Sequence, residues 1–189
     1  MVRHAPVAIE PDIPPERWHL SEAGRTAAGA LADGAAWDDV VQIYHSPQPK
    51  TAETAEALGR RLGIPRAADP DLREVRMDVG FLPTAEFEGR VGAWLAGADD
   101  TAFEPYADAE RRILRCVRGI VADAAGRSAV VVTHGRILAV FFGALLGSRV
   151  DVDGWRSIGM PDMAVVDLDR GAVTAGFFAG RPIRALLRV

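Results

Sequence analysis

Short runs of β-branched and other apolar residues alternate along the chain with stretches in which apolar residues recur at helical spacing. The runs at 40–44 and 129–133 predict buried strands, and each leads through a polar turn into a predicted helix, at 51–62 and 137–146. Strands that alternate with helices favour an α/β fold. We therefore expect a three-layer sandwich, with a mostly parallel central sheet and helices on both faces.

Further segments extend this pattern toward both ends of the chain. Ser21 is placed to cap a helix over 21–33, and helical spacing is also kept over 84–95. A longer helix over 105–125 has one apolar face. Its arginines are expected on a solvated face; they are Arg111, Arg112, Arg115 and Arg118. Closing strands are predicted over 163–168, 173–178 and 185–189.

Length and composition exclude several classes of protein. The 189 residues are 49% hydrophobic and 25% charged, which favours one domain over 1–189, with a lid or insertion at about 69–100 where the pattern is least regular. The net charge of -4 predicts no cationic surface for nucleic acid. The single cysteine, Cys116, has no internal disulfide partner, and no apolar run is long enough to cross a membrane. We expect a cytoplasmic protein that binds neither nucleic acid nor membrane; no pattern predicts its oligomeric state.

Charged and titratable residues gather where three predicted strands end. His4 follows a short first strand, and His134 follows the strand at 129–133. Ligands of open α/β sheets bind outside the carboxyl ends of the strands, so both histidines would face one crevice. Arg3 precedes His4, and Lys50 stands at the start of a helix, where anions are also favoured. This spacing predicts an anion site, although packed histidines and a surface lysine remain an alternative at this point.

Five motifs in order carry a resemblance to a known family. They are Val2-Arg3-His4-Ala5, Leu20-Ser21-Glu22-Ala23-Gly24-Arg25, Ser46-Pro47-Gln48-Pro49-Lys50-Thr51-Ala52-Glu53-Thr54-Ala55, Leu72-Arg73-Glu74 and Val132-Thr133-His134-Gly135. Together they resemble the histidine phosphatase (phosphoglycerate mutase-like) superfamily over most of the chain. The resemblance implies a nucleophile at His4, a proton donor at Glu74, phosphate binding and catalysis by His134, and phosphate binding by Arg3 and Lys50. It also implies a reaction that needs no metal and no cofactor.

Two departures from the family pattern bear on the activity. Ala5 replaces the glycine after the nucleophile, and Lys50 replaces an arginine, which keeps the charge but loses the bidentate geometry. The loop at 5–19 contains four prolines and lacks the Thr and Asn that often hold phosphate in the mutase branch. We expect a phosphatase that hydrolyses a small phosphate ester through a phosphohistidine. A phosphomutase and a non-catalytic phosphate-binding module are the alternatives.

The chemistry sets expectations for individual protonation states. A histidine attacks phosphorus only when neutral, and the charges of Arg3 and Lys50 are expected to lower the pKa of His4 and favour that form. His134 is expected to be protonated and to stabilise the phosphoryl oxygens. For the proton donor, the rivals of Glu74 are its acidic neighbours Asp78, Glu86 and Glu88.

The remaining histidines and the cysteine are not assigned to the chemistry. Cys116 is expected to be inert, since Ala122 stands where a cysteine phosphatase needs an arginine. His45 is expected to pack near the strand end, and His19 to line the loop.

Overall fold

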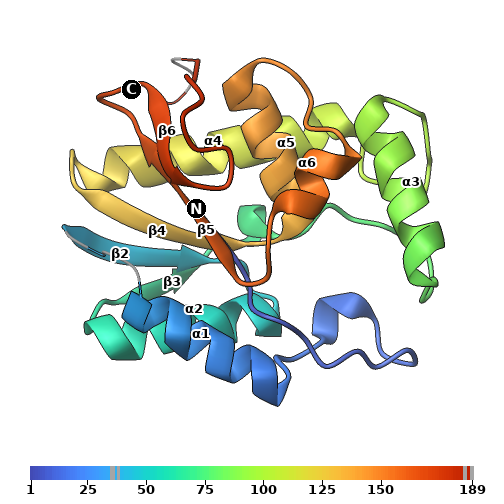
Figure 1. Cartoon of the computed structure of the whole chain (residues 1–189), viewed down its shortest axis with the longest axis horizontal. Helices are drawn as coiled ribbons and strands as arrows, with labels where there is room; N and C mark the ends of the chain where they lie inside the picture. The colour runs from blue at the N-terminus through green and yellow to red at the C-terminus, as the bar shows by residue number, and fades with distance from the viewer. Residues whose placement is uncertain (35–36, 38, 185–186, 188–189) are drawn as a thin grey trace.

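The computed structural model describes residues 1–34, 37, 39–184 and 187. In that part of the chain a six-stranded sheet has the order β3-β2-β4-β1-β5-β6 (Figure 1). The strands are β1 (Val2–Arg3), β2 (Val40–His45), β3 (Arg66–Ala68), β4 (Ser128–Thr133), β5 (Asp162–Asp167) and β6 (Ala172–Gly176). The α-helices are α1 (Glu22–Gly34), α2 (Pro49–Leu62), α3 (Thr84–Ala96), α4 (Tyr106–Ala124), α5 (Gly135–Leu146) and α6 (Val152–Ser157). Two 3-10 turns are η1 (Pro15–Arg17) and η2 (Pro70–Leu72).

The sheet combines a parallel part with an antiparallel edge. Strand β2 pairs in parallel with β3 and β4, and β4 pairs in parallel with β1. Strand β5 is antiparallel to β1 and to β6. The parallel strands are joined through helices, whereas a four-residue turn joins β5 to β6, which only an antiparallel pair permits. The predicted α/β sandwich is confirmed.

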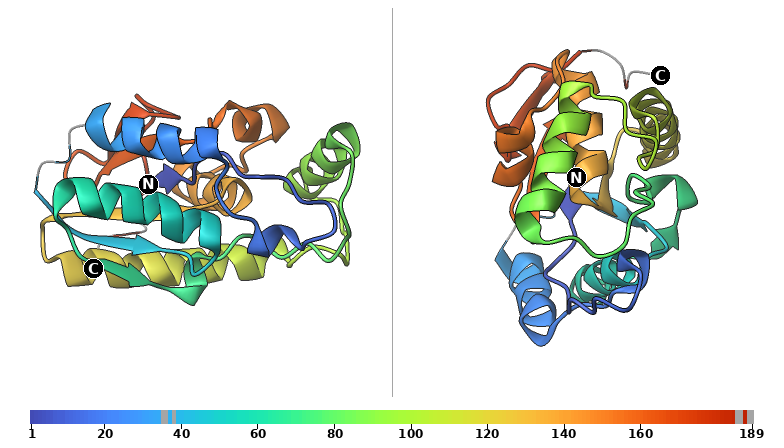
Figure 2. Two further views of the ribbon diagram at one scale, coloured as in Figure 1. Left: turned by 90° about the horizontal axis from the view of Figure 1, so that it is seen from below. Right: turned by 90° about the vertical axis from the view of Figure 1, so that its right-hand side faces the viewer.

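Helices cover both faces of the sheet and form two hydrophobic layers. Figures 1 and 2 show α1 and α2 side by side on one face, with α4 and α5 on the other. Buried side chains from α2, β2 and β4, among them Leu58, Ile43 and Val130, fill the first layer. The second layer is larger and includes Ile113 from α4 and Phe141 from α5. The central strands are therefore buried on both faces, which explains their continuous apolar runs.

Two elements differ from the sequence predictions. Strand β3 was not predicted because Arg66–Ala68 contains no β-branched or aromatic residue; it is a strand because it pairs with β2. Helix α6 was also not predicted, since it has six residues and includes Gly154. The strand predicted over 185–189 lies, except for Leu187, outside the described residues.

One expectation about the helix at 105–125 was wrong. Of its arginines, Arg111, Arg115 and Arg118 are exposed, but Arg112 is buried. Its long side chain turns inward to form an ion pair with Glu104. An amphipathic pattern assigns an arginine to solvent because burial of a lone charge is unfavourable, and it contains no information about a partner outside the helix. In the described chain, moreover, no helix is both long and apolar enough to span a membrane.

Glycine at position 24 permits a close approach between α1 and the segment that follows His4. A Cβ atom there would lie 1.9 Å from the Pro6 carbonyl oxygen, which also accepts a hydrogen bond from the Ser21 amide. The Ser21 hydroxyl in turn caps the helix by accepting from the Gly24 amide at 3.0 Å. The start of α1 is thus fastened directly to the backbone beyond His4.

We predict that Gly24→Ala lowers the free energy of unfolding by about 2 kcal/mol, as overpacking against backbone does. The matched control is Gly29→Ala in the same helix, where an added Cβ meets no atom within 4 Å. That change is expected to stabilise the helix by roughly 0.5–1 kcal/mol. Chemical denaturation of both variants checks the pair, and equal effects would contradict the close approach.

Candidate active site

Strand register places His4 beside His134. The parallel pairing of β1 with β4 sets Arg3 opposite Thr133, so the two residues that follow, His4 and His134, leave neighbouring strands at the same edge. The His4 amide donates a hydrogen bond of 3.0 Å to the Thr133 carbonyl, which extends the pairing by one step. The two imidazole rings meet edge to face, with centroids 5.2 Å apart. The structure thus brings together the two histidines that the sequence predicted to share a crevice.

The tautomer of His4 leaves one ring nitrogen free for chemistry. Its Nδ1 lies 2.8 Å from the Ala5 carbonyl oxygen, and because a carbonyl only accepts, Nδ1 carries the proton. The lone pair is therefore on Nε2. The pKa of the buried ring is lowered from 6.5 to about 3, mainly by burial, with smaller contributions from Lys50 and Arg3. The expected neutral form is present, but burial is its main cause and the neighbouring cations are secondary.

His134 is completely buried at the start of α5. Burial, followed by the charges of its neighbours, holds the pKa of its ring well below 6.5. The protonated His134 that we expected is therefore not the form favoured by this protein environment alone. Neither ring nitrogen has a hydrogen-bond partner among the described residues. A neutral ring still offers one N–H donor.

Arg3 lies against the first residue of α5. Its Nη1 donates to the Ile158 carbonyl at 2.5 Å, and its buried Nε has no partner in the described part of the chain. A Cβ at Gly135 would lie 3.1 Å from the guanidinium carbon, so glycine allows this approach. The Trp155 indole nitrogen is equally close to the same position.

Lys50 enters the site from the first turn of α2. Its ammonium group donates to the Pro15 carbonyl at 2.5 Å, in the loop at 5–19. The Thr54 hydroxyl, one turn along α2, accepts from the Ala5 amide and donates to the Lys50 carbonyl. Burial lowers the pKa of Lys50 to about 8, although Glu74 opposes the shift. Lys50 is thus a cation near neutral pH that loses its charge in mild alkali.

Glu74 lies at the N-terminus of α5. Its carboxylate accepts hydrogen bonds from the Ile137 amide at 2.9 Å and the Arg136 amide at 3.2 Å. Its negative charge raises the pKa of both Arg3 and Lys50, which is consistent with a place in the same site. The rival acids are occupied elsewhere or exposed: Asp78 pairs with Arg76, Glu88 pairs with Arg156, and Glu86 is exposed. Of the four acidic candidates, Glu74 is the one that makes hydrogen bonds to the helix that follows His134.

Arg136 is a site residue that sequence reasoning missed. Its Nε lies 3.5 Å from a Glu74 carboxylate oxygen, and its guanidinium lies over the Phe87 ring of α3, 5.5 Å from the centroid. Its positive charge also lowers the pKa of His134, Arg3 and Lys50. Its position two residues after His134, in the first turn of a helix at a strand end, was the available signal.

The hydrogen bonds of the remaining histidines and the cysteine are made to residues other than the predicted site residues. His45 is buried, with Nδ1 against the Ser46 carbonyl, and His19 is exposed and contacts Glu53. Cys116 is buried, and its burial and the nearby Asp69 raise the pKa of its thiol, so the reactive thiolate is disfavoured.

With this geometry established, comparison with known proteins identifies the family. A family model described as the histidine phosphatase superfamily (branch 1) matches residues 1–174. The chain belongs to the histidine phosphatase superfamily. The resemblance of the five motifs is thereby confirmed.

Relatives of this histidine phosphatase include named phosphatases and solved structures. A glucosyl-3-phosphoglycerate phosphatase of Mycolicibacterium vanbaalenii is 34% identical over 154 residues, which are 74% of this chain and 68% of the relative. The structure of a mycobacterial glucosyl-3-phosphoglycerate phosphatase has a TM-score of 0.66 and 27% identity, covering 86% of both chains. A phosphoglycerate mutase from Bacillus anthracis, with a TM-score of 0.63 over 76% of this chain and 77% of its own, is 17% identical and shares the fold alone.

We predict that the affinity for inorganic phosphate falls as pH rises through about 8, because Lys50 then loses its proton. The loss should reach roughly tenfold by about pH 10, the difference between a charged and a neutral donor. Competitive inhibition by phosphate measures it.

The Lys50→Arg variant is the control for this prediction. Arginine stays charged and offers a bidentate fork, so this variant should bind phosphate at least as well at pH 7 and keep its affinity in alkali. Lys50→Ala should bind weakly at every pH. An alkaline fall that persists in the arginine variant would assign the titration to another group.

Proposed function

We propose that this histidine phosphatase, a phosphoric monoester hydrolase, cleaves a small phosphorylated substrate through a phosphohistidine on His4. The observation that carries the proposal is the environment of His4: a neutral ring, with Nε2 free, faces His134 among Arg3, Lys50 and Glu74. The ring is aligned for attack because the Ala5 carbonyl holds the opposite nitrogen. Positive charge and N–H donors surround the position that a phosphoryl group would take.

In the first half of the reaction, the Nε2 lone pair forms a bond to phosphorus while the bond from phosphorus to the ester oxygen breaks. Arg3, Lys50 and the N–H of His134 stabilise the charge on the three phosphoryl oxygens. A protonated Glu74 transfers its proton to the departing oxygen, so the product leaves as a neutral alcohol.

In the second half, a water oxygen attacks the phosphorus of phosphohistidine. Glu74, now a carboxylate, takes a proton from that water, and the N–P bond breaks to return the electron pair to His4. Inorganic phosphate leaves and the neutral imidazole is restored. The two displacements replace one difficult step by two easier ones.

Hydrolysis is favoured over the two alternatives. A non-catalytic phosphate-binding module has no need of a proton donor, whereas the carboxylate of Glu74 lies at the N-terminus of the helix that follows His134. A phosphomutase is supported only by a shared fold at 17% identity, while the relatives above 30% identity include named phosphatases.

The relatives suggest a substrate class to test first. Enzymes named glucosyl-3-phosphoglycerate phosphatase act on a phosphate ester that also carries a carboxylate, and we propose a phosphorylated organic acid of this type here. Arg136 supports this choice, because it adds a cation beside Glu74. Figures 1 and 2 show the loop at 5–19 and α3 at the same end of the molecule, where both can shape a substrate pocket, and the proposed lid at 69–100 includes α3. A cytoplasmic location stays a prediction from the single cysteine.

The test of the function is the capture of phosphorus on His4. Wild-type protein mixed with labelled substrate and quenched in alkali is expected to hold acid-labile, alkali-stable label, located on His4 by peptide mapping. His4→Ala should carry no label and release no phosphate. Phosphate release without label in a rapid quench would reject the intermediate. Transfer of label to a second acceptor in place of water would make the enzyme a mutase.

A second prediction concerns Glu74, because a general acid matters only as much as the leaving group needs a proton. Against an alkyl phosphate, Glu74→Gln should lose about 10²–10⁴-fold in rate. Against p-nitrophenyl phosphate the first step should be far less affected, since nitrophenolate leaves unaided. The second step still needs a base, so stopped-flow traces should show a burst of nitrophenolate followed by slow turnover.

Asp78→Asn is the matched control, since that acid is exposed and paired with Arg76. It should change neither substrate's rate appreciably. Equal losses for both substrates in Glu74→Gln, with no burst, would show that another group is the acid.

A further inference from the structure

Glu74 lies on a segment with no regular secondary structure. The backbone leaves η2 at Leu72 and makes no helix or strand before the isolated bridge at Met77. The side chains of Leu72 and Val75, on either side of Glu74, are buried and anchor the segment in the core. A proton donor has to be held within about 0.5 Å of its working position, so further restraints on this segment are needed.

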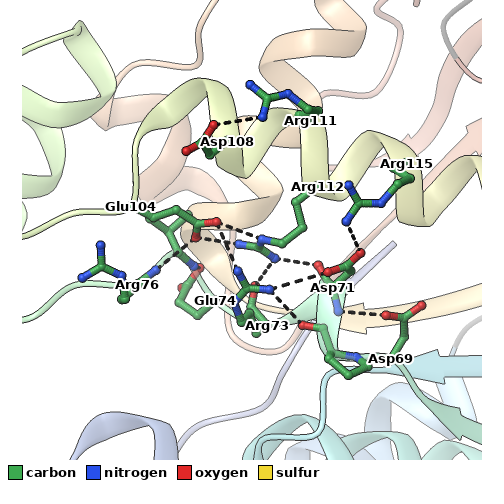
Figure 3. Close-up of polar contacts among 12 residues, drawn as sticks. Asp69, Asp71, Arg73, Glu74, Arg76, Glu104, Asp108, Arg111, Arg112 and Arg115 are labelled. Carbon is green, nitrogen blue, oxygen red and sulfur yellow. Dashed lines mark hydrogen bonds and ion pairs between the residues drawn. The ribbon is translucent and has the colours of Figure 1, made fainter.

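A buried ion pair between Arg112 of α4 and Glu104 contacts this segment. The guanidinium of Arg112 forms two parallel hydrogen bonds to the Glu104 carboxylate, of 2.9 Å from Nε and 2.8 Å from Nη2 (Figure 3). Both side chains are more than 90% buried. Burial tends to raise the pKa of Glu104, but the hydrogen bonds and charge of Arg112 hold it below its usual value, so the pair is ionised.

The pair also holds the backbone on both sides of Glu74. Before it, the remaining nitrogen of Arg112, Nη1, donates to the carbonyls of Asp71 at 2.6 Å and Arg73 at 3.0 Å. After it, the Arg76 amide donates to the Glu104 carboxylate at 3.3 Å. Figure 3 shows these bonds converging on the segment that carries Glu74. A guanidinium can form such a set because its donors point outward in one plane.

A third restraint links the same segment to the strand that carries His134. The Thr133 hydroxyl, fully buried at the end of β4, donates to the Leu72 carbonyl at 2.7 Å. The segment is thus fastened to β4 before Glu74 and to the ion pair on both sides of it. The carboxylate then meets the N-terminus of α5 at the distances given above.

We propose that Arg112 and Glu104 are positioning residues, whose ion pair clamps the backbone around Glu74 and so holds the general acid at the leaving group. The proposal rests on the function proposed above. Neither residue is placed at the phosphoryl group, so their effect is confined to the proton transfers of Glu74, to the leaving group in the first half of the reaction and from water in the second. A purely structural ion pair would affect the stability of the fold and both kinds of substrate alike.

Arg112→Lys and Glu104→Gln test the clamp without removing volume. Lysine has a point charge on a flexible stem and cannot bind Glu104 bidentately and two carbonyls at once. The first-step rate of Arg112→Lys toward an alkyl phosphate should fall on the order of 10²-fold, as small misplacements of a catalytic group do. The nitrophenolate burst rate should change by less than about threefold, because that leaving group needs no proton. Glu104→Gln should show the same selectivity, with a smaller loss.

Two controls separate misplacement from general loss of structure. Ile120→Val alters a buried residue two turns further along α4, away from the segment, and should leave the ratio of alkyl to aryl rates unchanged. In the Glu74→Gln background, Arg112→Lys should cause no further loss toward the alkyl phosphate, since no acid remains to be positioned.

The outcomes distinguish the clamp from the function on which it rests. A selective loss in Arg112→Lys that disappears in the Glu74→Gln background supports the clamp. Equal losses in the first-step rates of both substrates, or additive losses in the double variant, overturn it while Glu74 stays the acid. If Glu74→Gln itself shows no dependence on the leaving group, the acid assignment fails and the clamp fails with it.

Discussion

The parallel pairing of β1 with β4 is the constraint on which the site depends. Although β1 has only two residues, its pairing of Arg3 with Thr133 sets the register. The next residue after each of these is a histidine, so His4 and His134 come to lie side by side. A shift of one position would move His4 away from His134 and turn its side chain to the other face of the sheet. Each neighbouring contact, from the Ala5 carbonyl on Nδ1 to the Gly135 approach to Arg3, presupposes that register.

Burial determines the protonation states in this site more than neighbouring charge does. It is the largest cause of the lowered pKa of His4, His134 and Lys50 alike. A site of buried cations and neutral imidazoles is complementary to a phosphate dianion, because desolvated donors interact strongly with an anion that replaces their lost hydration. The same burial makes Lys50 sensitive to mild alkali, a property that the arginine of the family pattern would not have.

The proposed acid is held differently from the proposed nucleophile. His4 and His134 follow directly from paired strands, so the sheet itself positions them. Glu74 lies on an irregular segment that forms no strand pairing. The backbone of that segment forms hydrogen bonds with the side chains of Thr133, Arg112 and Glu104. The molecule thus positions the proposed nucleophile through secondary structure, and we propose that a buried ion pair positions the proposed acid.

The sequence by itself determined the α/β class, most helices, the central strands and the set His4, Glu74, His134, Arg3 and Lys50, whose catalytic roles stay predictions. These features follow from local patterns and short motifs, because the periodicity of an element and the residues at a strand end can be seen in a short stretch of sequence. Strand β3, the inward turn of Arg112 and the place of Arg136 beside Glu74 were decided only by tertiary structure. Each depends on a partner distant in the sequence: β2 for the strand, Glu104 and the segment around Glu74 for the two arginines. A periodic pattern indicates which face of a helix or strand is apolar. It does not indicate which charged side chain will be buried or which residue will form an ion pair with it.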